Sequence, residues 1–388
     1  MAETVTETLA ETAKVVIGAV RETAEGERRV ALTPETCKKL VAAGARVRIE
    51  RGLGDGAHAS DAAYADAGAE LVEDAAAVLN AADIVVCVQP PSAHAITGMK
   101  PGAALVGMLQ PQGDAARGEA IVARNIVAFP LERLPRTTRA QAMDILSSQA
   151  GMAGYKAMLI AAQLAPRFFP MLTTAAGTIR PSKVLVIGAG VAGLQAIATC
   201  KRLGAMVEAY DVRSAAREQI ESLGAKFIDV PYLTDEEREI AQGSGGYARA
   251  MPADWMRRQA ELVHERAKLA DIIITTALIP GRAAPVLISE ETVKAMKPGS
   301  VIVDLAVEQG GNCPLSELGK TVIKHGVYIV GEPNLATLVA ADASALYARN
   351  VLDFLKLIID KDAELLIDRE DEIIKASLVC AGSEILRK

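Results

Sequence analysis

The sequence has no hydrophobic run long enough to cross a membrane and no excess of positive charge. A membrane helix needs roughly 18–20 consecutive apolar residues, and no stretch approaches that length. The first residues, "MAETVTETLAETAK", are acidic and lack the basic start and apolar middle of a signal peptide, so we expect residues 1–13 to form an exposed extension. The net charge of −6 provides no basic surface of the kind that binds nucleic acid.

Cysteine and histidine are sparse as well. The five cysteines are scattered, odd in number and never arranged as CxxC, which favours a reducing compartment and argues against a disulfide framework. The four histidines are isolated and do not pair at the spacing of metal ligands, so we predict no metal site. His325, in "IKHGVYIV", is expected to lie in a turn before a strand.

The length of 388 residues, of which 51% are hydrophobic, predicts two domains, because one ordinary core does not grow so large. Strand-like and helix-like segments alternate from the start. Strands are predicted over 14–20, 45–50 and 84–91, and helices over 33–44, 60–72 and 73–83. Regular alternation of this kind is typical of a parallel α/β sheet.

A second α/β series begins at residue 183, and the segment 270–306 echoes 81–109 in order and spacing. We therefore predict an α/β fold of two doubly wound, Rossmann-like domains separated by a cleft, although unrelated parallel units also reuse such phrases. An apolar helix within 339–360 is expected to return the chain to the first domain, and its exposed apolar stretch 345–360 suggests a dimer. The predicted domains are 14–150 with 338–388, and 151–337.

A glycine motif predicts a dinucleotide site in the second domain. "VLVIGAGVAG" is a strand-like run that ends in Gly188-x-Gly190-x-x-Gly193 and continues into a helical pattern. Glycines at these positions permit a tight turn, close approach of a pyrophosphate, and close packing of helix on strand. Asp211 ends the next strand, where its carboxylate would accept the ribose hydroxyls and repel a 2′-phosphate. NAD(H) is therefore favoured over NADP(H), with nearby Arg213 as a reservation.

Several longer motifs resemble a known family. They include "ERRVALTP" (27–34), "RTTRAQAMDILSSQAGMAGY" (136–155), "GGYA", "ITTALIPG", "MKPGSVIVDLAVEQGGNCPLS" (296–316) and "VAADASALYARN" (339–350). Together with the glycine motif, they look like the soluble NAD(H)-binding component of proton-translocating NAD(P) transhydrogenase. The resemblance covers almost the whole chain beyond residue 13.

The resemblance implies an enzyme that acts together with other subunits. Hydride would pass directly between NAD(H) bound to this chain and NADP(H) bound to a partner subunit, coupled to proton translocation by a separate membrane subunit. The implied partners are a second copy of the chain and membrane-embedded subunits that include the NADP(H)-binding domain. The chain would then be cytoplasmic and peripherally associated with the inner membrane through those subunits.

The resemblance also assigns roles to individual residues. Arg136, Gln141 and Asp144 match positions in a polar segment that reaches over the nicotinamide, and we expect them to orient its ring. A glycine-rich lid over 237–255 would bring Tyr247 near the cofactor. The predicted cofactor-binding residues are Arg136, Arg139, Gln141, Asp144, Ser147, Gly188, Gly190, Val191, Gly193, Asp211, Val212, Arg213, Gly246, Tyr247, Thr276, Ala277 and Leu278.

Less specific interpretations of these residues stay open. Gln141 and Asp144 could merely cap the helix that follows them, and Tyr247 could lie by chance in an exposed loop. A non-catalytic NAD(H)-sensing module would keep the glycines and Asp211 but would have little use for Gln141 and Asp144.

Alanine dehydrogenase is the nearest alternative, because it shares the two-domain architecture and "RVALTP". That enzyme binds a keto acid with an arginine, a lysine and a histidine, and has an aspartate near its catalytic centre. Arg29 fits the arginine, whereas Gln89, Met108 and Glu308 stand at the other three positions. These departures remove the cation that binds a carboxylate and the group that moves a proton to the carbonyl.

Overall fold

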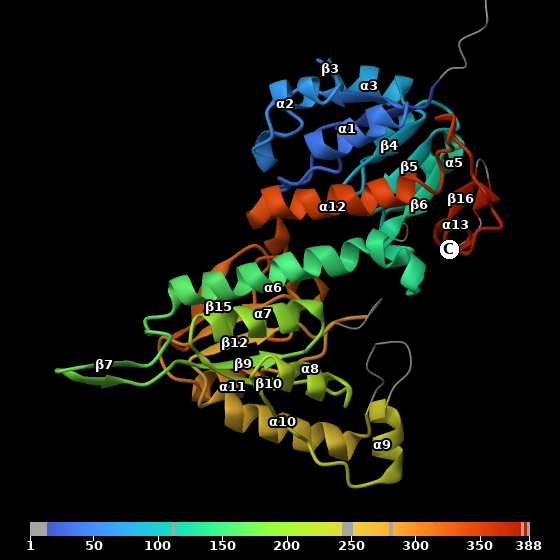
Figure 1. Cartoon of the computed structure of the whole chain (residues 1–388). Coiled ribbons are helices and arrows are strands. Elements are labelled where there is room, and N and C mark those ends of the chain that lie inside the picture. The colour runs from blue at the N-terminus through green and yellow to red at the C-terminus, as the bar shows by residue number, and fades with distance from the viewer. Residues whose placement is uncertain (1–13, 111–112, 243–250, 279–281, 382–383, 386–388) are drawn as a thin grey trace, which may run out of the picture. The chain divides into compact units, whose positions relative to one another are not determined.

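A computed structural model of the chain describes residues 14–110, 113–242, 251–278, 282–381 and 384–385. The chain folds into two compact units (Figure 1). Unit 1 combines the chain up to Ser148 with the residues from Ala340 onward, and unit 2 is Gln149–Val339. The extension expected over residues 1–13 lies outside the described residues.

Unit 1 contains an eight-stranded sheet in the order β17-β16-β6-β5-β4-β1-β2-β3. Strands β1 to β6 are parallel to their neighbours, whereas β16 pairs antiparallel with β6 and with β17. The six parallel strands therefore follow the 3-2-1-4-5-6 order of a doubly wound sheet. The strands are β1 (Val16–Ala19), β2 (Arg46–Glu50), β3 (Glu70–Val72), β4 (Ile84–Val86), β5 (Ala104–Gly107), β6 (Val127–Pro130), β16 (Cys380–Ala381) and β17 (Glu384–Ile385).

Short helices connect these strands, and the sequence signals for their ends are used. Thr33 accepts a hydrogen bond from the backbone N–H of Thr36 in a capping box at the start of α1, and Gly44 follows the helix with φ +95°. The helical elements of unit 1 are α1 (Pro34–Ala42), η1 (Asp55–Ala57), α2 (Asp61–Asp66), α3 (Ala75–Ala81), α4 (Ala93–Thr97), α5 (Ala115–Ala123), η2 (Leu131–Arg133), η3 (Thr138–Met143), α12 (Ala340–Leu355) and α13 (Glu372–Ser377).

The helix predicted over 60–72 is too long. It ends at Asp66, and residues Glu70–Val72 form β3, which pairs with β2. Gly68 has φ +89°, a conformation that ends a helix and that side chains rarely adopt. The alanine-rich composition favoured a helix, but the glycine and the pairing with β2 decided otherwise.

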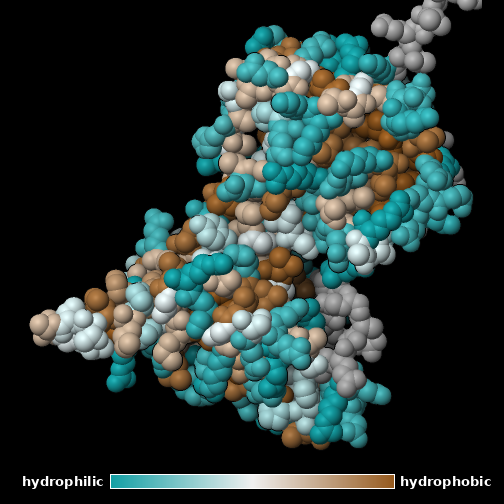
Figure 2. Space-filling model, in the orientation of Figure 1, coloured by the Kyte–Doolittle hydropathy of each residue, from teal (hydrophilic) through white to brown (hydrophobic). Residues whose placement is uncertain are grey.

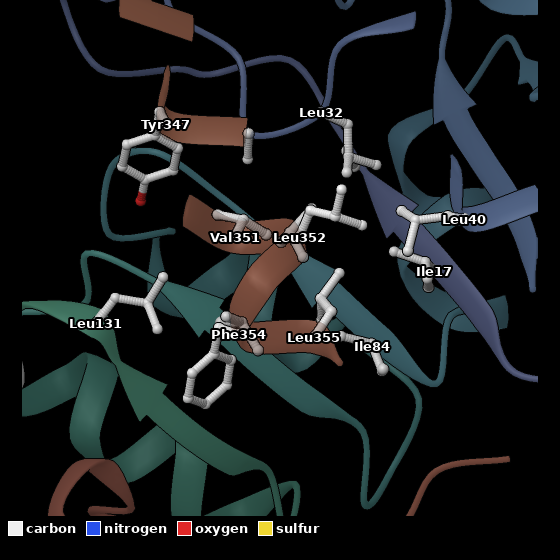
Figure 3. Close-up of a cluster of buried hydrophobic side chains, with 14 of the residues drawn as sticks. Ile17, Leu32, Leu40, Ile84, Leu131, Tyr347, Val351, Leu352, Phe354 and Leu355 are labelled. Carbon is white, nitrogen blue, oxygen red and sulfur yellow. The ribbon is translucent and has the colours of Figure 1, made fainter. Parts of the chain in front are cut away.

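Helix α12 supplies much of the core of unit 1. Tyr347, Val351, Phe354 and Leu355 are fully buried against the strands (Figure 3). The chain therefore returns to the first unit, as predicted. The expectation that stretch 345–360 presents an exposed apolar face is wrong, because that face packs on the unit's own sheet.

Unit 2 contains a seven-stranded sheet in the order β11-β10-β9-β12-β13-β15-β14, in which β14 pairs antiparallel with β15 and the other pairings are parallel. Its parallel strands repeat the order found in unit 1, and the echoing segments supply equivalent strands, β4 and β5 in one unit and β12 and β13 in the other. The strands are β9 (Lys183–Ile187), β10 (Met206–Tyr210), β11 (Lys226–Phe227), β12 (Ile272–Thr275), β13 (Val301–Asp304), β14 (Thr321–Lys324) and β15 (Val327–Val330).

The helices of unit 2 fit this wound arrangement. His325, with φ +53°, lies in the turn between β14 and β15, as predicted. Helix α6 carries the chain from the end of unit 1 into unit 2. The helical elements are α6 (Ile145–Leu164), α7 (Val191–Arg202), α8 (Ala216–Ser222), α9 (Asp235–Gln242), α10 (Ala253–Ala267), α11 (Glu290–Ala295), η4 (Val307–Gln309) and η5 (Leu335–Val339).

A two-stranded hairpin projects from unit 2 (Figure 1). Its strands are β7 (Leu172–Thr174) and β8 (Gly177–Ile179), and all six of their residues are exposed. Met171, beside β7, and Ile179 are among the exposed large apolar residues. Figure 2 shows brown and pale residues along this hairpin.

All five cysteines are free and buried. Within the described residues of the chain, no helix is both long enough and apolar enough to cross a membrane.

Candidate functional site

The glycine motif forms a tight turn between β9 and α7. Gly188 has φ +94°, and a Cβ atom there would lie 2.5 Å from the Thr276 hydroxyl oxygen. A Cβ atom on Gly193 would lie 1.8 Å from the Gly188 carbonyl oxygen, so no side chain fits at either position. A Cβ atom on Gly190 would meet only open space. The first and third glycines therefore allow close packing, and the second leaves the approach to the backbone clear.

The start of α7 is suited to a phosphate group. Gly190 is the N-cap residue and has no side chain to offer the first N–H groups, and Val191 begins the helix with 46% of its surface exposed. Uncapped N–H groups and the positive end of the helix dipole favour an anion at this point. The turn thus fits the pyrophosphate of a dinucleotide.

Asp211 follows β10 and lies against the glycine turn. Its carboxylate accepts a hydrogen bond of 2.7 Å from the backbone N–H of Ala189, and it is only 7% exposed. The Arg213 side chain donates to both carboxylate oxygens, at 2.9 Å from Nε and 2.8 Å from Nη2. This hydrogen bonding raises the pKa of Arg213 and commits its charge to Asp211. The reservation about Arg213 as a binder of 2′-phosphate is met by this pairing. Val212 packs beside the apolar cluster of the same unit.

The residues after β12 complete the site in unit 2. The Thr276 hydroxyl donates to the Gly188 carbonyl oxygen at 2.9 Å, so the β12 end and the glycine turn are joined directly. Ala277 is half-buried and Leu278 is 43% exposed. All ten predicted cofactor residues that belong to the described residues of unit 2 follow β9, β10 or β12 at the carboxyl edge of its sheet.

The polar segment lies in unit 1, as η3 and the start of α6. Asp144 accepts hydrogen bonds from the Ser147 backbone N–H at 2.9 Å and from the Ser147 hydroxyl at 2.6 Å, so it caps α6 as the simpler interpretation expected. The Gln141 side chain is exposed instead. Arg136 is exposed too, and Arg139 forms an ion pair with Asp371.

The side chain of Asn350 holds this segment from α12. Its Nδ2 donates to the Ala142 carbonyl oxygen and its Oδ1 accepts from the Ser148 hydroxyl, each at 2.7 Å. Asn350 is not among the predicted residues, because a polar residue on an amphipathic helix gives no sign of what it contacts across the chain.

The predicted lid is only partly described. Residues up to Gln242 belong to α9 and those from Ala253 to α10, so both ends of the predicted loop 237–255 are helical and not loop. Gly246 and Tyr247 lie outside the described residues.

A buried acidic cluster occupies unit 1 around Arg29. The Arg29 guanidinium pairs with Glu27 at 2.7 Å, and the two side chains are 3% and 0% exposed. Gln89 donates to the same carboxylate at 2.8 Å. Burial raises the pKa of Glu27, but hydrogen bonds from Arg29 and Gln89 outweigh it and lower the value to about 2. Arg29 is therefore neutralised within the chain.

A second carboxylate, Glu22, lies beside this pair. It accepts hydrogen bonds from the backbone N–H groups of Val88 at 2.5 Å and Gln89 at 3.1 Å. Burial nevertheless raises the pKa of Glu22 to about 7. No sequence pattern indicates this cluster, because its acidic members lie far along the chain from the strand end that they meet.

The strand order, the glycine turn and the uncapped helix together define a dinucleotide-binding domain of the Rossmann type. Residues 18–153 match the alanine dehydrogenase/PNT N-terminal domain, and residues 157–388 match the C-terminal domain. The chain belongs to this family and, within it, to the NAD(P) transhydrogenase alpha subunits.

Individual relatives support this placement. The chain is 50% identical to an NAD(P) transhydrogenase subunit alpha of Rhodospirillum rubrum over 94% of this chain and 96% of that one. It matches the crystal structure of a transhydrogenase from Sinorhizobium meliloti with a TM-score of 0.82 and 42% identity, over 96% of this chain and 99% of that one. An alanine dehydrogenase from Methanococcus maripaludis is 26% identical over 93% of this chain and 92% of its own length.

We expect Asp211→Ala to weaken NADH binding by about tenfold and to reduce the preference for NADH over NADPH, because it removes a hydrogen-bond acceptor and frees the Arg213 guanidinium for a phosphate. Titration of each nucleotide by calorimetry measures both affinities. The double variant Asp211→Ala/Arg213→Ala should lose the gain in NADPH affinity. An unchanged preference in the single variant would mean that specificity is set elsewhere.

Glu22 predicts a pH dependence of stability. The folded chain keeps the Glu22 proton up to about pH 7, whereas the unfolded chain releases it near its ordinary pKa of 4.5. Between these values the folded state binds more protons, so the free energy of unfolding should fall as the pH rises. Urea titrations at several pH values should show this fall reduced in Glu22→Gln. Glu25→Gln, at an exposed position, serves as the control, and equal profiles for all three proteins would contradict the prediction.

Proposed function

We propose that this chain is the NAD(H)-binding component of a proton-translocating transhydrogenase. Hydride passes directly between NAD(H) on this chain and NADP(H) on a partner subunit, and a separate membrane subunit couples the transfer to proton translocation. The observation that carries the proposal is the glycine turn with Asp211 beside it, in a chain 50% identical to a transhydrogenase alpha subunit. Because that relative is named as a subunit, it supports assembly with further subunits.

Bound NAD(H) supplies or accepts a hydride at its nicotinamide ring. Because a single C–H bond migrates, the reaction needs no general acid or base. It needs orientation and exclusion of water, and positioning of this kind contributes about 7–11 kcal/mol in well-oriented reactions.

The chain's own residues divide these tasks. The N–H groups at the start of α7 hold the pyrophosphate and Asp211 holds the adenosine ribose. Thr276, Ala277 and Leu278 flank the nicotinamide ribose. Arg136, Gln141 and Asp144 orient the nicotinamide, with Asp144 held in place by Ser147. The exposed side chain of Gln141 is free to turn toward a ligand.

The buried cluster around Arg29 disfavours an alanine dehydrogenase activity. A keto acid needs a cation for its carboxylate, but Arg29 is already paired with Glu27, which Gln89 also contacts. Opening that pair would leave a buried charge uncompensated. The positions that would carry a lysine and a histidine hold Gln89 and Met108, neither of which can bind a carboxylate as a cation or move a proton.

The central experiment measures reduction of an NAD analogue by NADPH. The chain is tested alone and mixed with the NADP(H)-binding domain from the same source. Activity that requires the mixture supports the proposal. Oxidation of NADH by the chain alone, on addition of pyruvate and ammonium, would overturn it in favour of an amino-acid dehydrogenase.

Gln141→Asn should slow hydride transfer in the mixture by about tenfold or more, because a shorter side chain misplaces the ring, while NADH affinity stays within about twofold. Stopped-flow absorbance gives the transfer rate and calorimetry the affinity. Gln219→Asn, at an exposed glutamine of α8, is the matched control. A collapse of NADH binding in Gln141→Asn would make Gln141 a structural anchor.

We also propose that the chain forms a homodimer and reaches the cytoplasmic face of the inner membrane through its partner subunits. The exposed β7–β8 hairpin supports the dimer, because an isolated two-stranded hairpin is marginally stable in water and gains stability when a second copy covers it.

Ile179→Asp should therefore shift the chain toward monomer, since it places a charge on the exposed hairpin. Analytical ultracentrifugation measures the molecular mass over a concentration series. Ile323→Asp, at an exposed apolar position of β14, should leave the mass unchanged. Equal masses for both variants would place the interface elsewhere.

A further inference from the structure

A buried carboxylate organises the loop that follows β13. Asp304 is 0% exposed, and its two oxygens accept five hydrogen bonds at 2.7–3.1 Å. The donors are the hydroxyls of Thr275 and Ser316 and the backbone N–H groups of Ala306, Asn312 and Cys313. Such dense hydrogen bonding keeps a buried carboxylate ionised and fixes everything that donates to it.

Two glycines allow the loop to fold back onto this carboxylate. Gly310 and Gly311 have φ values of +94° and +79°, and a Cβ atom on Gly311 would lie 2.7 Å from an Asp304 side-chain oxygen. The turn that they make directs the backbone N–H of Asn312 toward Asp304 at 3.1 Å. The Asn312 side chain is thereby buried, with 0% exposed.

The Asn312 amide fastens the segment after β12. Its Oδ1 accepts from the Ala277 backbone N–H at 3.1 Å, and its Nδ2 donates to the carbonyl oxygens of Ala277 at 2.9 Å and of Pro285 at 2.8 Å. One side chain thus satisfies both backbone groups of Ala277 and also grips the chain where it returns at Pro285. Residues 279–281 lie outside the described residues and do not enter this arrangement.

Ala277 connects this network to the cofactor turn. The preceding residue, Thr276, donates from its backbone N–H to the Ile187 carbonyl oxygen at 2.8 Å and from its hydroxyl to the Gly188 carbonyl oxygen at 2.9 Å. A continuous series of contacts therefore runs from Asp304 through Asn312, Ala277 and Thr276 to the glycine turn.

We propose that Asn312, held by Asp304, is the positioning residue for the nicotinamide half of the cofactor site. It acts through Ala277 and Thr276 and does not itself contact the cofactor. The proposal rests on the proposed function, because it assumes that NAD(H) binds at this edge of the sheet. The adenosine half depends instead on Asp211 and the start of α7, which Asn312 does not touch.

The test compares two probes that share the adenosine half. NADH contains both halves, whereas AMP contains only the adenosine and one phosphate. Calorimetry with the full chain measures the dissociation constant of each probe for the unmodified protein, Asn312→Ala and Ser316→Ala. The last variant is a matched control, because it removes a hydrogen bond to Asp304 without touching Ala277.

We expect Asn312→Ala to raise the NADH dissociation constant by about tenfold and to change that of AMP by less than about threefold, because three hydrogen bonds to the nicotinamide side are lost. Ser316→Ala should bind both probes as the unmodified chain does. Circular dichroism and retained AMP binding establish that Asn312→Ala is folded.

The other outcomes overturn the inference in distinguishable ways. Equal loss of NADH and AMP affinity in Asn312→Ala would mean that Asn312 only supports the fold. Unchanged NADH affinity would mean that Ala277 and Thr276 keep their positions without it. An unmodified chain that fails to bind NADH would overturn the proposed function, and this inference with it.

Discussion

The nucleotide end of unit 2 depends on the contact between the backbone at Gly193 and the carbonyl oxygen of Gly188. The space between them excludes even a methyl group, so helix α7 lies as close to strand β9 as the backbone permits. This closeness places the first N–H groups of α7 over the strand ends. Because Asp211 and Thr276 both hydrogen bond to the same turn, a displacement of α7 would disturb the ribose and nicotinamide sides together.

The two units treat their buried charges differently. In unit 1, Arg29, Glu27 and Gln89 satisfy one another, so the cluster presents no free cation to a ligand. In unit 2, Asp304 is satisfied by its own loop, but Asp211 receives donors that a ribose can supplement at the sheet edge. The same wound sheet therefore supports a closed polar core in one unit and an open, ligand-facing edge in the other.

Much of the fold and of the site was predictable because the signals are local. The glycine turn, Asp211, the capping of α1 and the alternation of strand and helix depend on residues close together in the sequence. The β3 strand was missed because pairing with β2 outweighed alanine-rich composition, and the face of α12 was misjudged because periodicity shows that a helix is amphipathic but not what covers it. Residues that act across the sequence, such as Asn350 on Ala142 or Asn312 on Ala277, have no periodic signature, and only the folded chain brings their amides to the carbonyl groups that they bind.

The burial of all five cysteines has a chemical consequence. Burial raises the pKa of each thiol, to about 12 for Cys37 and Cys200 and above the ordinary value for Cys87, Cys313 and Cys380. The thiolate is the form that reacts with peroxides and disulfides, so the folded chain offers them almost none. A protein that handles reducing equivalents thereby keeps its own sulfur atoms out of the redox chemistry around it.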